Sequence, residues 1–465
     1  MSEAPKRPLD RLQAADVAHH LHPFTDADEL RRRPPRLIVR GQGVRIWDAD
    51  DHEILDAMSG LWCVNLGYGR TDLVEAAQRQ MLRLPYYNTF FQTTTEPAAR
   101  LAAALARIAP PGMRQVFFTE CGSTANDTMV RMVRHYWELR RQPLRKVIIS
   151  RRNAYHGSTL AAASLGGMAS MHAQGGLPLP DFSHIEQPHR LQLGLPGESE
   201  QDFALRAAGW LDERIRAIGA ERVAAFVLEP VQGAGGVIVP PAGYARAIES
   251  ICRRHQVLLV SDEVICGFGR LGYWFGCQHP AIDIEPDLIT FAKGVTSGYL
   301  PLGGVLVGAE VGEVLSARAG EFAHGFTYSG HPSCCALALA NLHALEHEQV
   351  LQQVRQVTAP YLQQRFADLA RHPLAGDPEG LGMTAALTLW QDKATRRPFP
   401  DEARAGLLCR DACFDSGVVM RAVGQRMIIA PPLVSTIDDI DRMVERIGIA
   451  LDRTQQALRR GGWLR

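Results

Sequence analysis

A single lysine, Lys293, follows a short apolar run at residues 288–292, and Gly294 and Gly298 come after it. The run is typical of a buried strand, so the lysine stands at a strand end, where an unpaired ammonium group costs several kcal/mol. A partly desolvated lysine loses its proton easily and can form a Schiff base with a carbonyl carbon. The alternative is that Lys293 extends its charged end out of the strand into solvent. This stretch alone leaves both interpretations open.

Residues able to bind a ligand follow further apolar runs of the same kind. The pattern predicts strands over residues 115–118, 146–149, 223–228 and 257–261, separated by helices over 122–141, 203–218 and 243–255. The residues at or after these strand ends are Ser123, Tyr155, His156, Glu229 and Asp262. Short apolar strands separated by helices are typical of a mostly parallel sheet, which binds ligands at the carboxyl ends of its strands. We therefore expect these side chains to surround one site with the lysine.

A lysine that forms a Schiff base suits pyridoxal phosphate, whose chemistry makes three further demands. The ring nitrogen needs a carboxylate that keeps it protonated, and Asp262 is placed to provide one. The phosphate needs donors at a helix N-terminus, which Gly122 and Ser123 can supply at the start of a long helix. The two ring faces need flat or apolar neighbours, and Tyr155 and Val264 are suitable. Taken singly, Asp262 is as easily a turn residue and Ser123 a helix N-cap.

The two ends of the chain have a different pattern. Short strands are predicted over residues 37–39, 44–47 and 54–57 near the start, and over 382–389, 418–420 and 427–429 near the end. Helices are predicted over 331–347, 349–370, 401–416 and 437–458. We expect an α/β protein with three parts: a segment 1–75 that joins a small α+β domain, a large cofactor-binding domain 76–335, and the small domain 336–465.

The composition limits the function classes. The 465 residues are 46% hydrophobic and 22% charged, and the formal net charge is zero, which argues against binding to nucleic acid or an anionic membrane. No apolar run approaches the ~18 residues that cross a membrane. Nine cysteines without a Cys-x-x-Cys pair indicate reduced thiols, and residues 1–16 lack the apolar core of a secretory signal. We expect a soluble, cytoplasmic protein that self-associates readily.

Three histidines, His19, His20 and His22, lie close together near the start of the chain. We see no carboxylate or cysteine at the sequence spacing from these histidines that a metal site would need. We therefore expect a loop whose histidines are solvated or hydrogen-bonded, and no metal.

These motifs together resemble the class III, fold-type I, pyridoxal-phosphate-dependent aminotransferases of the amine:pyruvate (omega-transaminase) group. The resemblance runs from about His19 to Leu433. It is most specific over residues 261–270 and 292–294, and extends to 61–69, 153–159, 229–236 and 324–332. It implies a large domain with a mostly parallel sheet covered by helices, and a smaller α+β domain made from both chain ends.

The resemblance also implies roles at the cofactor. Lys293 would bind the cofactor covalently and then move a proton between the substrate carbon and the cofactor. Asp262 would hold the pyridinium nitrogen, and Tyr155 and Val264 would enclose the ring. The remaining implied cofactor-binding residues are Gly122 and Ser123 at the phosphate, His156, Glu229, and Thr327, which would reach the phosphate of the neighbouring subunit.

The implied reaction moves an amino group from a primary amine or ω-amino acid to pyruvate by a ping-pong mechanism, giving an aldehyde or ketone and L-alanine. Arg421 would grip the keto acid carboxylate and swing away for an apolar amine. The implied pocket aromatics are Phe24, Trp62, Phe90, Phe91 and Tyr155. The resemblance further implies a homodimer or homotetramer with sites at the subunit interface.

Several alternatives stay open from the sequence. The donor could be putrescine or another polyamine, β-alanine or taurine, and a racemase or aminomutase could use the same fold. A binding protein without catalysis is a third class, against which the pair Asp262 and Lys293 argues. The chain also departs from the family pattern at Glu120, Cys121, Thr124, Leu271 and Glu379.

Overall fold

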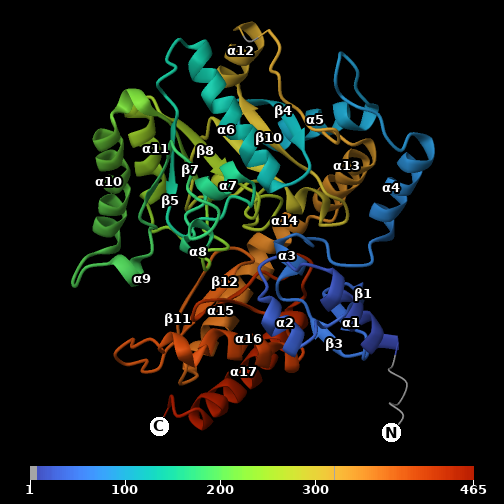
Figure 1. The fold of residues 1–465 in the computed structure, drawn as a ribbon, viewed down its shortest axis with the longest axis vertical. Coiled ribbons are helices and arrows are strands. Elements are labelled where there is room, and N and C mark those ends of the chain that lie inside the picture. The colour runs from blue at the N-terminus through green and yellow to red at the C-terminus, as the bar shows by residue number, and fades with distance from the viewer. Residues whose placement is uncertain (1–7, 319, 465) are drawn as a thin grey trace.

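The computed structural model describes residues 8–318 and 320–464. A larger α/β part lies above a smaller part in Figure 1, and in the smaller part the blue N-terminal segments lie beside the orange and red C-terminal ones. Among the described residues, no helix has the length and apolar character needed to cross a membrane.

A seven-stranded sheet forms the centre of the larger part. Its strands are β4 (Met113–Thr119), β5 (Val147–Arg151), β6 (Phe182–Ile185), β7 (Val223–Leu228), β8 (Leu258–Asp262), β9 (Leu288–Phe291) and β10 (Gly303–Gly308). The order across the sheet is β4-β10-β9-β8-β7-β5-β6. All neighbours pair in parallel except β10, which is antiparallel to both β4 and β9. The predicted mostly parallel sheet is confirmed.

Helices cover both faces of this sheet because its strands are apolar on both sides. Along β7, Phe226 and Leu228 contribute to one hydrophobic cluster, and Ala225 and Val227 contribute to the other. The helices of the larger part are α4 (Thr71–Arg83), α5 (Glu96–Ile108), α6 (Gly122–Leu139), α7 (Leu160–Leu165), α8 (Ala169–His172), α9 (Arg190–Leu193), α10 (Glu200–Ile218), α11 (Tyr244–His255), α12 (Ala309–Arg318) and α13 (Pro332–His347). In Figure 1, α10 and α11 lie together at one side, and α6 crosses the sheet near β10.

The smaller part is built from both chain ends. One sheet has the order β1-β2-β3 and the other β11-β12-β14-β13. The strands are β1 (Ile38–Gln42), β2 (Arg45–Asp48), β3 (Glu53–Leu55), β11 (Ala375–Gly380), β12 (Ala385–Leu389), β13 (Arg421–Val423) and β14 (Arg426–Ile429). The helices are α1 (Pro8–His19), α2 (Ala27–Arg32), α3 (Ser59–Trp62), α14 (Val350–Gln353), α15 (Ala359–Asp368), α16 (Ala405–Asp415) and α17 (Ile437–Arg460).

Backbone hydrogen bonds join the two ends directly. The N–H of Leu55 donates to the carbonyl of Gly417 at 2.8 Å. The N–H of Ala430 donates to the carbonyl of Ala57 at 2.7 Å. Helix α13 spans the predicted boundary at 335/336 and packs against α4 and α5. The division into 1–75, 76–335 and 336–465 stays a prediction, and residues 1–7 and 465 lie outside the described part of the chain.

Some of the predicted helices and strands differ from those in the structure, and some observed strands were not predicted. The strand predicted over 418–420 is absent there, because Val418 makes only an isolated bridge to Leu55. The strand begins instead at Arg421. The helix predicted over 349–370 is interrupted by a π turn at Val354–Thr358, just before Pro360, which has no N–H to continue an α-helical ladder. Strands β6 and β11 were not predicted.

Candidate active site

Lys293 lines a cavity of about 420 Å³. It follows β9 directly and begins a 3-10 turn, Lys293–Thr296, with a positive φ of 47°. Burial lowers the pKa of the Lys293 ammonium, while the charges of Asp262 and Glu229 oppose that fall. A low pKa leaves more of the amine unprotonated and nucleophilic near neutral pH. The half-buried Lys293 side chain lines the cavity and is not an exposed side chain that extends out of the strand.

Asp262 is the last residue of β8 and is only 3% exposed. Its Oδ2 accepts a hydrogen bond from Asn126 Nδ2 at 2.9 Å and lies 2.6 Å from Nδ1 of the buried His156. Its Oδ1 accepts from the backbone N–H of Val264 at 3.0 Å. Three partners from α6, the loop after β5 and the loop after β8 thus fix one carboxylate at the cavity wall.

Glu229 follows β7 and is also buried. Its Oε1 accepts from the backbone N–H of Tyr155 at 3.2 Å, and its Oε2 accepts from that of Gly233 at 2.9 Å. Burial raises the pKa of the Glu229 carboxyl, and His156 nearby opposes the rise. The carboxyl group thus holds the loop that carries Tyr155 against the loop that follows β7.

The N-terminus of α6 forms another wall of the cavity. A Cβ on Gly122 would lie 2.9 Å from Cγ1 of Val264, so a larger residue does not fit there. Ser123 Oγ accepts from the backbone N–H of Ser158 at 3.0 Å. Thr124 accepts from the N–H of Cys121 at 3.1 Å and so caps the helix, which explains how the chain tolerates this departure. The first turn of an 18-residue helix favours an anion.

The structure brings the predicted cofactor-binding residues together, with one exception. The cavity is lined by Gly122, Ser123, Tyr155, His156, Glu229, Asp262, Val264 and Lys293. Thr327 is the exception: it does not line the cavity, and its carbonyl accepts from the hydroxyl of Tyr86 at 2.6 Å. Asn126 was not predicted, although a buried asparagine on a helix face with Met129 and Val133 was a usable signal.

The predicted substrate residues are more scattered. Only Tyr155 lines the cavity. Phe24 is 77% exposed and meets Tyr155 edge-on at 6.4 Å between ring centroids. Trp62 is 1% exposed and packs in a hydrophobic cluster that includes Ile265. Phe90 and the 88% exposed Phe91 lie together at 5.8 Å, and Phe90 contacts the loop that contains Thr327, where Gly325 leaves room for its ring.

Arg421 is the first residue of β13, the edge strand of the four-stranded sheet in the smaller part. Burial lowers the pKa of its guanidinium, and Tyr155 opposes that fall. The guanidinium is also near enough to Lys293 to lower the pKa of the lysine. Within the described residues, the Arg421 side chain forms no hydrogen bond or ion pair, so it is free to bind an anion.

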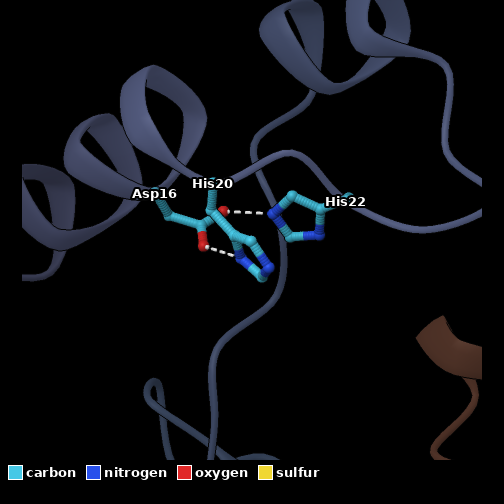
Figure 2. A group of neighbouring side chains, drawn as sticks. All are labelled: Asp16, His20 and His22. Atoms are coloured by element: carbon cyan, nitrogen blue, oxygen red, sulfur yellow. Dashed lines mark hydrogen bonds and ion pairs between the residues drawn. The ribbon is translucent and has the colours of Figure 1, made fainter.

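A separate cluster of ligand-type side chains lies at the C-terminal end of α1 (Figure 2). Asp16 Oδ1 is 3.0 Å from His20 Nδ1, and Oδ2 is 2.6 Å from His22 Nε2. The expectation that no carboxylate accompanies these histidines is wrong, because Asp16 lies one helical turn before His20. The expectation that they are hydrogen-bonded is confirmed for His20 and His22. These bonds lower the pKa of the Asp16 carboxyl and occupy both of its oxygens.

The chain belongs to the class III aminotransferases, whose family model matches residues 28–451. It is 52% identical to a putrescine–pyruvate aminotransferase from Pseudomonas aeruginosa over 96% of this chain and 97% of the relative. It is 40% identical to a diaminobutyrate–2-oxoglutarate transaminase from Halomonas elongata, covering 97% of each chain. Among solved structures, an omega transaminase from Pseudomonas jessenii in complex with PMP matches with a TM-score of 0.93 and 39% identity, covering 96% of this chain and 98% of that one.

Enzymes of this class use pyridoxal phosphate, and so does this chain. The cavity fits the group: it combines a lysine with a lowered pKa, a fixed carboxylate, and a helix N-terminus whose glycine leaves no room for a Cβ. When bound, the cofactor supplies an electrophilic carbon and a ring that takes up electrons.

Proposed function

We propose that this enzyme transfers an amino group from a primary amine or an ω-amino acid to pyruvate, releasing an aldehyde or ketone and L-alanine. The observation that carries the proposal is the meeting of Lys293 and Asp262 in one cavity, with the unpaired Arg421 beside it. The putrescine–pyruvate activity of the Pseudomonas aeruginosa relative supports pyruvate as acceptor and a diamine as donor.

Each residue of the cavity has a separate proposed role. Lys293 would hold the cofactor covalently through its amine, and its Nζ would also move the proton at the substrate carbon. Asp262, fixed by Asn126 and His156, would keep the ring nitrogen protonated. Gly122 and Ser123 at the N-terminus of α6 would hold the phosphate, and Tyr155 and Val264 would pack against the ring.

A donor panel tests the reaction itself. We expect L-alanine to form from pyruvate with at least one of putrescine, β-alanine, taurine and 1-phenylethylamine, measured with the holoenzyme. Alanine formation distinguishes a transaminase from a racemase or aminomutase, which returns no amino group to pyruvate. A holoenzyme that forms no alanine with any donor would contradict the proposal.

Arg421 is the proposed carboxylate clamp. Replacing it with alanine removes charge-assisted hydrogen bonds worth about 1.5–3 kcal/mol, so we expect KM for pyruvate to rise about ten- to hundredfold. We expect KM for an apolar amine to change less than about threefold, since the side chain swings away from that substrate. Arg442→Ala, at an exposed position on α17, is the matched control. Equal changes for pyruvate and amine would contradict this role.

We also propose a homodimer or homotetramer in the cytoplasm. Phe90, Phe91 and Thr327 belong to the predicted site, yet they lie together outside the cavity of their own chain. The 88% exposure of Phe91 is unusual for a large aromatic residue and supports burial in a subunit interface. These residues would then complete the site of the neighbouring subunit.

A further inference from the structure

Three residues with carboxylate side chains line the cavity, and two of these side chains have hydrogen-bond partners in the protein. Asp262 is fixed by Asn126, His156 and Val264, and Glu229 by two backbone N–H groups. The third is Glu120, which follows the last residue of β4. Its Oε2 is buried without a hydrogen-bond partner, and no ion pair to it occurs within residues 8–318 and 320–464. A buried carboxylate oxygen without a partner is costly, so a cationic ligand is expected beside it.

We propose that Glu120 is a specificity-determining residue that binds the distal ammonium group of a diamine or polyamine donor. This inference rests on the proposed function, because it concerns the amine that the enzyme accepts. The reacting amino group would lie at Lys293, and the second ammonium group would lie in the same cavity beside Glu120, which also lines it. The volume of about 420 Å³ is within the range of small-molecule sites.

The charges around the cavity favour a cation supplied by the substrate. Among the described residues that line it, Lys293 is the one with a cationic side chain of lysine or arginine type, and it is engaged by the cofactor. The proposed phosphate cradle at Gly122 and Ser123 lies only two residues beyond Glu120, so the carboxylate and the phosphate would repel each other. An ammonium group near both anions would offset that repulsion. The sequence already shows Glu120 as a departure from the family pattern, and the cavity gives that departure a function.

The test compares two amines that differ at one end. Butane-1,4-diamine and pentan-1-amine have the same number of heavy atoms, but a methyl group replaces the distal ammonium in the second. Each is titrated into the yellow holoenzyme without pyruvate, and the loss of colour gives an apparent Kd. We expect Glu120→Gln to raise the Kd of the diamine about ten- to hundredfold, and that of the monoamine less than about threefold. Glu445→Gln, at an exposed position on α17, should change neither.

Other results would overturn the inference. If Glu120 only influences the phosphate, Glu120→Gln will change both amines equally and will alter the affinity for pyridoxal phosphate measured by fluorescence. If a neighbouring subunit supplies the cation, the variant will weaken the oligomer in light-scattering measurements and will not discriminate between the amines. Failure of the proposed function has a different signature: the wild-type enzyme would not form alanine from pyruvate with any donor.

Discussion

Replacing Lys293 with alanine is expected to lower the rate of alanine formation at least about a thousandfold. Proton transfer by a positioned side chain contributes about 10²–10⁴-fold on its own, and this variant also loses the covalent attachment of the cofactor. The lowered pKa of Lys293 suits both tasks, since each needs the unprotonated amine. The measurement is kcat with pyruvate and the best donor of the panel, together with the absorbance of the bound cofactor.

The chain offers a matched control for this change. Lys146 and Lys393 are both exposed, and Lys146 lies immediately before β5 and does not line the cavity. We expect Lys146→Ala to leave kcat within about a factor of two, since surface substitutions usually have small effects. An active Lys293→Ala enzyme with normal yellow colour would show that another amine holds the cofactor.

Replacing Asp262 with asparagine is expected to lower kcat by about 10²–10³-fold, the scale seen when one preorganised electrostatic group is lost from an active site. The amide has nearly the same shape but carries no negative charge to keep a ring nitrogen protonated. We expect the variant to keep its cofactor, because Lys293, Gly122 and Ser123 are unchanged. The measurements are kcat and the retention of yellow colour after gel filtration.

Glu263 provides the comparison for Asp262. It is the next residue and is equally buried, but its carboxylate accepts from the N–H groups of Gly276 at 2.7 Å and Cys277 at 2.8 Å and does not line the cavity. We expect Glu263→Gln to lower Tm while kcat stays within about threefold of the wild type. A larger loss of kcat in Glu263→Gln than in Asp262→Asn would contradict the role of Asp262.

The clustering of the candidate site residues could be predicted because a parallel sheet brings distant residues together at one edge. Ser123, Tyr155, Asp262 and Lys293 belong to four different segments, yet each lies at or after the end of a strand whose carboxyl end meets the others. The apolar strands were visible as short runs because helices bury both of their faces. The same reasoning predicted that the smaller part would combine both chain ends, and the bonds from Leu55 and Ala57 agree with it.

Other features depend on contacts that no local pattern encodes. Strand β11, Ala375–Gly380, contains proline and two glycines, so its pairing with β12 comes from the tertiary fold and not from strand propensity. Asn126 binds Asp262 across 136 positions of sequence. Phe90 and Thr327 lie outside the cavity that the other predicted residues line, and neither spacing nor periodicity reveals this separation.

The most direct test of the active site is to locate the cofactor chemically. Borohydride reduction of the yellow holoenzyme makes the lysine linkage permanent, and mass spectrometry of a proteolytic digest identifies the modified residue. We expect the added mass on the peptide that contains Lys293, in one copy per chain. Modification of Lys146 or Lys393 instead, or an unmodified digest from a reduced, bleached enzyme, would contradict the assignment of this cavity as the active site.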